Sequence, residues 1–368
     1  MKSFVELRRH AGNAALFHAV ELSLVGAVRG VPLHLHAQGV RGTGKTTVLR
    51  SAAALLPPIS RVAGCLFNCD PREPHCPHHR VAAGGPAGGG EGWPVEEVPA
   101  PFRELSHSTK TATAVGSLDL SRLVGRDDPA AALLPGLIPQ AHRGILFVDE
   151  INRLADTAPE LTDLLLDVMG TKPGRVQVEE AGLPVAVLPL TTTVWAASNP
   201  DEDPGPLAEL RRQLADRFDL VVNVERPGEP EAVAEIVAAA AGVGRRPSPA
   251  AGHRQHLASL RASIIRAAEL AGQVVLPETL SRTIARLYCS YGVESLRAAE
   301  ALALAAIYHC ALRGGRVAER EDLAAVLPLV WGHRLEPDQL RLAQAELRQG
   351  RGRPLAPVVA GAGRLPDL

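Results

Sequence analysis

Aromatic residues, lysines and long hydrophobic runs are all scarce in this sequence. Aromatic residues make up 3% of the 368 residues and the formal net charge is −1, so few rings are available for base stacking and no global charge attracts nucleic acid. We therefore expect no nucleic-acid partner. The sequence also lacks an uninterrupted apolar run of spanning length and a hydrophobic segment of the signal-peptide type. These absences predict a cytoplasmic protein with no membrane span.

What the chain does contain is 46% hydrophobic residues in a length sufficient for two globular domains. Residues 1–226 alternate stretches typical of buried strands with helical stretches, which predicts an α/β domain with a mainly parallel sheet. Residues 228–345 show only helical periodicity and are expected to form a helical domain. We further expect a glycine- and proline-rich loop at residues 82–101 and a disordered tail at residues 346–368.

One of the four lysines, Lys45, lies in the segment QGVRGTGKTTVLR, between a predicted strand and a predicted helix. This segment has the G-x-x-x-x-G-K-[ST] spacing of a phosphate-binding loop, in which glycines let backbone N–H groups surround a phosphate. Lys45 would reach the terminal phosphates, and the Thr46 hydroxyl would bind Mg²⁺. The residues of this segment expected to contact the nucleotide are Gly39, Gly42, Thr43, Gly44, Lys45, Thr46 and Thr47.

Polar side chains end two further apolar runs. Asp149 and Glu150 follow the run ILFV and should emerge at the carboxyl edge of a buried strand, where α/β sheets bind ligands. Asp149 would hold Mg²⁺ and Glu150 would orient or deprotonate water, which indicates hydrolysis rather than nucleotide binding alone. Asn199 ends the next run, and its amide would bind the γ-phosphate or the attacking water.

The segment LRRQLADRFDL contains three arginines, Arg211, Arg212 and Arg217. Any of them could stabilise transition-state charge on a phosphate bound by a neighbouring subunit. The residues alone leave open which of the three does so.

The chain resembles AAA+ ATPases of the magnesium chelatase I-subunit family, which is related to the MoxR-type ATPases. The resemblance rests on six motifs that occur in the family's order over roughly residues 5–335: GVRGTGKTT, AHRGILFVDEINRL, LTDLLLDVMGT, SNPDED, LRRQLADRFDL and LRAAEALALAA. It implies an AAA+ P-loop NTPase core followed by an all-α lid domain. It also implies assembly into a ring, commonly a hexamer, with ATP bound between subunits.

The resemblance also implies roles for individual residues. By position, Lys45 and Thr46 match the Walker A pair, Asp149 and Glu150 match the Walker B pair, and Asn199 matches sensor 1. Two arginines have likenesses of their own: Arg217 is similar to the arginine finger, and Arg297 is similar to the sensor 2 arginine that the lid brings onto the nucleotide.

One further segment matches the family, a second matches it in part, and one domain known from a partner subunit is not found after the lid. The segment GRVQVEEAGLPVAVLP, with Gly182 and Pro184 at its bend, resembles the hairpin that the family inserts before sensor 1. Residues 105–123 align with a family insert, but the first half of this segment departs from the usual glycine-containing, charged sequence of that insert. The integrin-like domain of the D subunit does not follow the lid, so a D subunit and a large chelatase subunit are expected as separate partner chains.

A cluster of cysteines and histidines lies in the segment GCLFNCDPREPHCPHH. Cys65, Cys69, Cys76 and His79 have spacings close to those of tetrahedral zinc sites, and thiolates and imidazole suit Zn²⁺. A metal would order a proline-broken segment that is too polar to fold alone. An iron–sulfur site and free thiols remain open alternatives. The other two cysteines, Cys289 and Cys310, are expected to be core thiols on apolar helix faces.

These observations favour an ATP-hydrolysing motor subunit that resembles the magnesium chelatase I subunit and couples hydrolysis to metal insertion into a tetrapyrrole by a partner subunit. A MoxR-like ATPase that remodels a protein client or metalloenzyme is the alternative within the same fold. A non-hydrolysing scaffold that presents the cysteine-rich segment is a third hypothesis, against which the intact Asp149, Glu150 and Arg217 argue.

Overall fold

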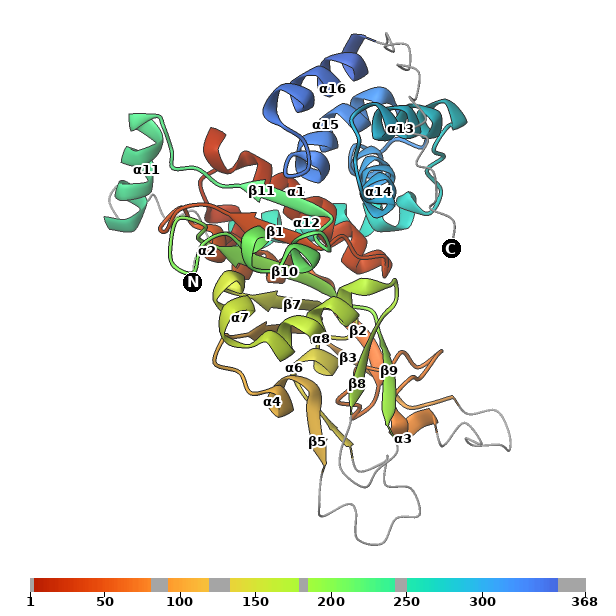
Figure 1. Cartoon of the computed structure of the whole chain (residues 1–368). Coiled ribbons are helices and arrows are strands. Elements are labelled where there is room, and N and C mark those ends of the chain that lie inside the picture. Colours follow the sequence, from red (N-terminus) through yellow and green to blue (C-terminus); the bar gives the residue numbers. More distant parts are fainter. Residues whose placement is uncertain (1–2, 81–91, 119–132, 179–184, 242–249, 350–368) are drawn as a thin grey trace, which may run out of the picture.

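The computed structural model describes residues 3–80, 92–118, 133–178, 185–241 and 250–349. A five-stranded sheet forms its centre (Figure 1). In spatial order its strands are β11 (Leu220–Asn223), β1 (Leu35–Gln38), β10 (Thr193–Ser198), β7 (Ile145–Val148) and β4 (Phe102–Leu105). Every neighbouring pair in this sheet is parallel. The predicted α/β fold with a mainly parallel sheet is therefore confirmed.

Strand β7 is apolar along its whole length because both faces of the sheet are covered. Along β7, Phe147 packs into one hydrophobic cluster, whereas Leu146 and Val148 pack into a second. In β10, Trp195 and Val194 are divided between the same two clusters. A parallel strand buried on both faces is expected to be continuously hydrophobic rather than alternating.

Helices cover each face of the sheet. Residues of α1 (Ala11–Arg29) and α2 (Lys45–Ala52) lie in the first cluster, with the short helices η1 (Phe4–Glu6) and η2 (Ala53–Leu55). The second cluster contains residues of α6 (Leu137–Gln140), α7 (Ile151–Thr157) and α8 (Pro159–Gly170). Helix α8 begins with proline at its first position and buries Leu161, Leu165 and Val168, the spacing of a single helical stripe. Two short helices, α9 (Leu207–Leu210) and α10 (Arg212–Ala215), lead from this side to β11.

The C-terminal part of the described chain is helical (Figure 1). Its helices are α11 (Pro230–Ala241), α12 (Ala250–Ala271), α13 (Glu278–Ser290), α14 (Leu296–Leu312), α15 (Arg320–Trp331) and α16 (Pro337–Gln349). Helix α12 packs against both α1 and α14, and the Tyr308 hydroxyl of α14 donates to the carbonyl of Val31 at 2.8 Å. The α/β and helical parts therefore share one hydrophobic cluster, and the division at residues 226–228 stays a prediction.

Three antiparallel hairpins extend on the side of the sheet away from these C-terminal helices (Figure 1). They pair β2 (Ile59–Val62) with β3 (Val95–Val98), β5 (Gly116–Leu118) with β6 (Leu133–Pro135), and β8 (Gly174–Val178) with β9 (Ala186–Leu190). Helix α3 (Pro77–Arg80) follows the cysteine-rich segment, and α4 (Thr111–Val115) precedes β5. The hairpin expected before Asn199 is present as β8 and β9, while its predicted bend at Gly182 and Pro184 lies outside the described residues.

Two predicted irregular segments are partly wrong. Within residues 82–101, Val95–Val98 form strand β3, because these residues pair with β2 and Glu96 forms an ion pair with Arg61 at 2.8 Å; residues 81–91 lie outside the described chain. Residues 346–349 of the predicted tail belong to helix α16, which continues to Gln349 and buries Leu347. Residues 350–368 are likewise outside the described chain.

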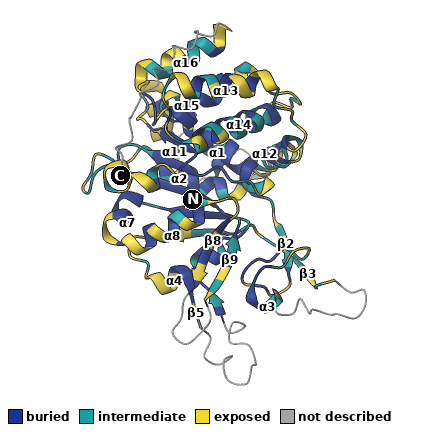
Figure 2. Ribbon diagram, turned by 45° about the vertical axis from the view of Figure 1, so that its right-hand side comes forward, coloured by how far each residue is buried: buried dark blue, intermediate teal, exposed yellow. Residues whose placement is uncertain are grey.

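Helix α1 is long and apolar enough to cross a membrane by length and composition alone. Its side chains Leu16, Phe17, Val20 and Leu24 are nevertheless at most 1% exposed and belong to the hydrophobic cluster that includes the sheet. Figure 2 shows buried residues concentrated where the sheet meets α1, whereas α16 is largely exposed. These contacts are those of a core helix, and the absence of a membrane span stays a prediction.

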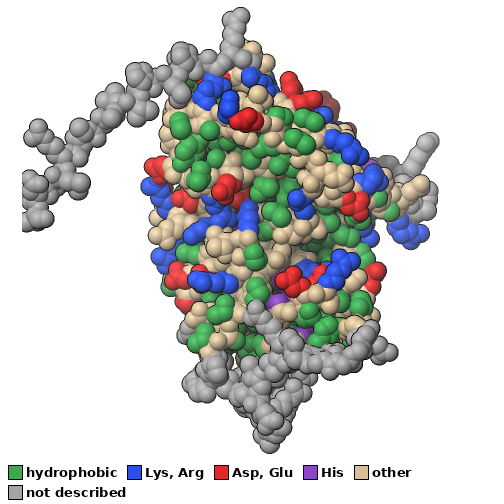
Figure 3. Space-filling model, turned by 90° about the vertical axis from the view of Figure 1, so that its right-hand side faces the viewer, with side chains coloured by type: hydrophobic (Ala, Val, Ile, Leu, Met, Phe, Trp, Pro, Cys, Tyr) green, Lys and Arg blue, Asp and Glu red, His purple; other side chains and the backbone are tan. Residues whose placement is uncertain are grey.

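Charges of both signs are interspersed on the face drawn in Figure 3. Lys and Arg side chains alternate with Asp and Glu side chains, with hydrophobic side chains between them. This face therefore offers no continuous basic surface of the kind that tracks a phosphate backbone. That nucleic acid is not a partner stays a prediction.

Two neutral histidines are buried at β1. Burial lowers the pKa of both His34 and His36 to about 3. The Nδ1 atom of His34 accepts the Val194 N–H at 3.0 Å, and His36 Nε2 lies 2.9 Å from the Ser198 hydroxyl. The charge of a second proton on either ring would therefore be desolvated, and at His34 a proton on Nδ1 would also conflict with the bond from Val194.

We expect stability to fall as the pH drops below 6.5. Above that value the two rings are neutral in both states, and between 6.5 and 3 only the unfolded chain binds the protons, so unfolding becomes more favourable. The loss is about 1.4 kcal/mol per pH unit for each histidine. Urea denaturation at several pH values should show a shallower dependence for His36→Gln. The exposed His107→Gln is the control, and parallel profiles for His36→Gln and the wild type would contradict the assignment.

Candidate functional site

The order of the strands brings three separate motifs to one edge of the sheet. Strand β10 lies between β1 and β7, and all three strands run in the same direction. The glycine-rich segment follows β1, the acidic pair follows β7, and Asn199 follows β10. Asn199 is therefore held between the other two motifs, at the carboxyl edge where parallel sheets bind ligands.

Glycines shape the segment between β1 and α2. Gly42 and Gly44 have φ values of 82° and 85°, in the left-handed region that favours glycine, and Lys45 begins α2 immediately afterwards. Gly39 has a φ of 146°, and a Cβ atom there would lie 2.2 Å from the carbonyl oxygen of Val224. The close approach at Gly39 therefore requires glycine, and the φ values at Gly42 and Gly44 favour it.

Lys45 connects the glycine-rich segment to the strand beside it. Its Nζ atom donates to the carbonyl oxygens of Gly39 at 2.5 Å and Val40 at 2.8 Å, and to Asn199 Oδ1 at 2.9 Å. The residue is only 5% exposed. Burial lowers the pKa of Lys45, and the carboxylates of Asp201 and Asp149 act in the opposite direction. The ammonium is thus fixed by oxygen atoms at the place where a phosphate oxygen would be bound.

Thr46 and Asp149 form the oxygen-rich side of the site. The Thr46 hydroxyl donates to Asp149 Oδ1 at 3.2 Å. The other oxygen of Asp149 forms an ion pair with Arg50 at 3.2 Å, and Arg50 also pairs with Glu104 of β4 at 2.9 Å. A hydroxyl and a carboxylate side by side are the oxygen ligands that Mg²⁺ prefers, so this donor set is compatible with the ion.

Glu150 has an unusual backbone conformation. Its φ is 51° and its ψ is 49°, the left-handed region, which is rare for a residue with a long side chain. The carboxylate is 3.5 Å from Arg153 on α7. Such strained positions cluster at functional sites, where the surrounding structure holds them.

These groups surround a cavity of about 340 Å³, within the usual range for a small-molecule site. Among the predicted residues, those that line it are Gly42, Gly44, Lys45, Thr46, Thr47, Asp149, Glu150 and Asn199. Gly39 and Thr43 do not line the cavity, but both make hydrogen bonds within the segment. The Gly39 carbonyl accepts from Lys45, and the Thr43 hydroxyl donates to the Val40 carbonyl. The sequence reasoning missed Arg41, Ala197 and Ser198. Of these, Arg41 could have been found, because it is a cation inside the phosphate-loop motif.

The predicted arginines do not line this cavity. Arg217 donates to the Gly170 carbonyl at 3.3 Å, and Arg297 on α14 donates to the same carbonyl at 3.3 Å and to that of Met169 at 2.7 Å. Arg297 also pairs with the buried Asp219 at 3.4 Å, just before β11 and therefore at the edge of the sheet opposite the cavity. Arg297 therefore does not line the cavity of its own chain, and its expected role at the nucleotide stays a prediction.

The other two arginines of this segment are more exposed. Arg212 forms an ion pair with Glu294 at 2.8 Å, with both side chains largely exposed. Arg211 is exposed as well. The structure therefore distinguishes Arg217, the half-buried member, from its two neighbours.

The predicted cysteine and histidine ligands do come together. The ligand atoms of Cys65, Cys69, Cys76 and His79 all lie within 4.8 Å of one another. The cluster belongs to the segment between β2 and α3 and shares no residue with the lining of the cavity. It is a second site, separate from the one at the sheet edge.

Comparison with known proteins agrees with this geometry. A magnesium-chelatase 38 kDa subunit from Acidiphilium rubrum is 36% identical over 351 residues, which cover 92% of this chain and 93% of the relative. The subunit of the same description from Cereibacter sphaeroides is 33% identical and covers 82% of this chain and 84% of the relative. The chain belongs to the magnesium-chelatase 38 kDa subunit family.

Two further comparisons concern the fold of this family member. A family model described as the AAA lid domain matches residues 281–351. A crystal structure from Cytophaga hutchinsonii, 16% identical, superposes with a TM-score of 0.54 over 93% of this chain and 90% of that chain, a likeness of fold alone. With its parallel sheet, lid and phosphate loop, the chain is an AAA+ ATPase of the magnesium-chelatase I-subunit type.

Replacing Lys45 with methionine should abolish tight nucleotide binding. The change keeps much of the side-chain length but removes the ammonium, and a hydrogen bond to a charged group contributes about 1.5–3 kcal/mol. We expect the Kd for ADP, measured by calorimetry, to rise at least about tenfold. The exposed Lys110→Met serves as the matched control. Unchanged affinity in Lys45→Met, with the control also unchanged, would contradict the assignment of the cavity.

Proposed function

We propose that this chain hydrolyses ATP at the carboxyl edge of β1, β10 and β7 and that the energy drives insertion of a metal ion into a tetrapyrrole by a separate subunit. The observation that carries the proposal is the contact of Lys45 with Asn199 beside the pair formed by Thr46 and Asp149. Because these groups come from three different motifs, a simple phosphate-binding turn does not explain them. Membership of the magnesium-chelatase family supports the coupling to metal insertion.

Five residues of the cavity have a proposed part in hydrolysis. Lys45 binds the terminal phosphates, and Thr46 and Asp149 hold Mg²⁺, which neutralises charge on the phosphates when bound. Glu150 takes a proton from the attacking water or orients it. Asn199, fixed by Lys45, positions the same water or the γ-phosphate.

We also propose that Arg217 and Arg297 act on the nucleotide of a neighbouring subunit in a ring, with six subunits as the expected number. Both bind the Gly170 carbonyl, and neither lines the cavity of its own chain. Either of these two guanidiniums would therefore have to reach the γ-phosphate of another copy. Heterologous contacts of this kind close into rings.

The partners follow from the same argument. The cavity has the lining of a phosphate site, so the tetrapyrrole would be bound by a large chelatase subunit, with a D subunit as the second partner. That the relative from Acidiphilium rubrum is a subunit of a chelatase supports an assembly of several chains. We place this assembly in the cytoplasm.

Changing Glu150 to glutamine tests the hydrolytic step. Loss of a group that takes a proton from water should lower ATP turnover about 100-fold or more, while ATP binding measured by calorimetry stays within about twofold of the wild type. The exposed Glu160→Gln on α8 is the control. Turnover that survives in Glu150→Gln would remove Glu150 from the mechanism. Absence of turnover in the wild type, with and without chelatase subunits, would reject the proposal.

Mixing two inactive variants tests whether Arg217 acts between subunits. Arg217→Ala subunits keep Glu150 in the cavity, and Glu150→Gln subunits keep Arg217. In a mixed ring, some interfaces therefore combine an intact Glu150 from one subunit with an intact Arg217 from its neighbour. With random mixing in equal amounts, turnover should recover to about a quarter of the wild-type value. If Arg217 acts within its own chain, the mixture stays inactive. Arg212→Ala, which removes only an exposed ion pair, should remain active by itself.

A further inference from the structure

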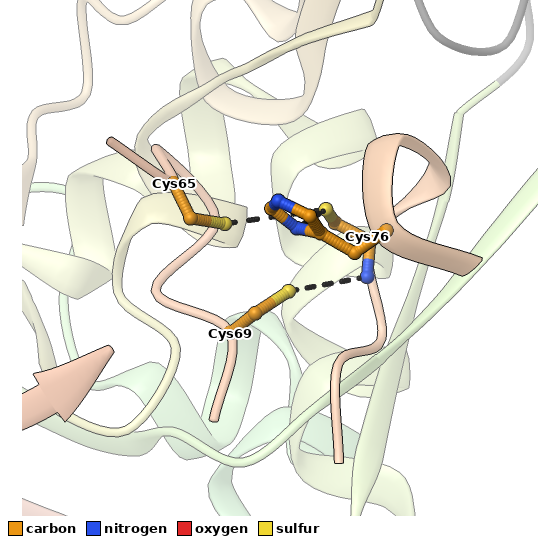
Figure 4. A group of neighbouring side chains, drawn as sticks. Cys65, Cys69 and Cys76 are labelled. Carbon is orange, nitrogen blue, oxygen red and sulfur yellow. Dashed lines mark hydrogen bonds between the residues drawn. The ribbon is translucent and has the colours of Figure 1, made fainter. Parts of the chain in front are cut away.

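Three thiols and one imidazole converge in the segment between β2 and α3. Cys65 and Cys69 lie in the turns after β2, Cys76 directly precedes α3, and His79 is on α3. Figure 4 shows the side chains of Cys65, Cys69 and Cys76 directed toward one another. The three cysteines are 0–4% exposed. Such a concentration of buried sulfur atoms in one short segment calls for a chemical explanation.

The spacing of the ligand atoms matches a single ion. The Sγ atoms of Cys65 and Cys76 are 4.0 Å apart, and Cys76 Sγ is 3.0 Å from His79 Nδ1. Zn–S bonds of about 2.3 Å in a tetrahedron place neighbouring ligand atoms about 3.8 Å apart. A disulfide requires sulfur atoms about 2.05 Å apart, so Cys65 and Cys76 do not form one, and all three cysteines are free.

Hydrogen bonds around Cys69 favour an ionised sulfur. Its Sγ atom accepts the backbone N–H groups of His75 and Cys76, each at 3.3 Å. The ring nitrogen Nδ1 of His75 is 3.4 Å from the same sulfur. His75 is not one of the four ligand residues. It is placed to orient the Cys69 thiolate by a hydrogen bond, as residues next to metal ligands often do.

We propose that Cys65, Cys69, Cys76 and His79 bind one structural Zn²⁺ ion. Three thiolates and one imidazole are a ligand set of structural zinc sites, in which protein atoms fill all four positions. An iron–sulfur cluster contains several metal ions and is held by four cysteines in the usual case, whereas this group has three and the spacing of one ion.

The ion would fix the β2–α3 segment against the second hydrophobic cluster. Phe67, between two of the ligands, is 1% exposed. Asn68, at a φ of 54°, donates to the Gln140 carbonyl at 2.8 Å and accepts from Arg61 at 2.8 Å. Within the described residues, the strand β2 that leads into this segment pairs with β3 and not with the central sheet.

Metal analysis of the purified full-length protein tests the proposal. The wild type should contain about one zinc per chain, and Cys69→Ser should lose most of it. Cys289→Ser is the matched control, because Cys289 is exposed and far along the chain on α13, contrary to its expected place in the core. Wild-type protein that holds no zinc after refolding with Zn²⁺ would overturn the proposal, and so would iron accompanied by acid-labile sulfide.

Two neighbouring histidines provide a second test, which remains informative even if Cys69→Ser partly unfolds. His79→Cys should keep zinc, because a fourth thiolate replaces the imidazole, whereas His79→Ala should bind it at least about tenfold more weakly. His78→Ala is the control, since His78 contacts the Leu133 carbonyl instead. Equal zinc content in His79→Ala and His78→Ala would remove His79 from the ligand set.

X-ray absorption at the zinc edge identifies the ligands in the folded wild type. Three sulfur atoms at about 2.3 Å and one nitrogen at about 2.0 Å are expected, and a different set would overturn the assignment. The proposal does not depend on ATP hydrolysis, because the cluster and the cavity share no residue. Lys45→Met should therefore retain its zinc while losing nucleotide.

Discussion

A single buried carboxylate, Asp219, holds the sheet and the helical lid in their relative positions. It is 2% exposed and accepts the backbone N–H of His34 at 2.9 Å, while Lys172 lies 3.3 Å and Arg297 3.4 Å from its oxygens. Burial raises the pKa of Asp219, but the charges of Lys172 and Arg297 and the hydrogen bond from His34 outweigh it, and the net pKa is lowered. Removing one partner of a buried charge typically costs about 3–5 kcal/mol, so the lid arginine is held firmly against the start of the sheet.

This arrangement has a consequence for the proposed action between subunits. Arg334, which follows α15, bonds to Asp216 and to the Phe218 carbonyl at 3.3 and 3.4 Å, so the lid holds the chain on both sides of Arg217. The same strands that begin beside Asp219 end at the cavity: His34 precedes β1, and the phosphate loop follows it. The arginines and the cavity therefore occupy opposite edges of one rigid sheet. This separation is compatible with the proposed head-to-tail ring, in which the arginines of one chain would face the cavity of the next.

The sequence predicted the parts of the site that depend on local chemistry. The phosphate loop and the acidic pair could be identified because residue types at fixed spacing decide them. The place of Asn199 between them depends on β10 lying between β1 and β7, which is a property of topology that no local pattern contains. The partner of Arg297 was not predictable either, because Asp219 is 78 residues away along the chain. Strands β3 and β4 were missed, since short strands at the border of a loop carry little periodicity. Cys289 was assigned to the core from an apolar helix pattern, but its side of α13 faces solvent.

The cysteine cluster shows how a polar segment can be ordered without a large core. Strands β2 and β3 form a two-stranded hairpin of four residue pairs, and an isolated hairpin of this kind is marginally stable at best. Its burial pattern leaves Ser60 and Val95 exposed, so little apolar area holds it to the rest of the molecule. Arg143 binds the Ser60 carbonyl and Asp70, but exposed ion pairs contribute about 0–1 kcal/mol each. A metal ion bound only by the folded segment would add its binding free energy directly to folding. A buried ion with four protein ligands would therefore stabilise the fold of this segment, as the hydrophobic layers stabilise the central sheet.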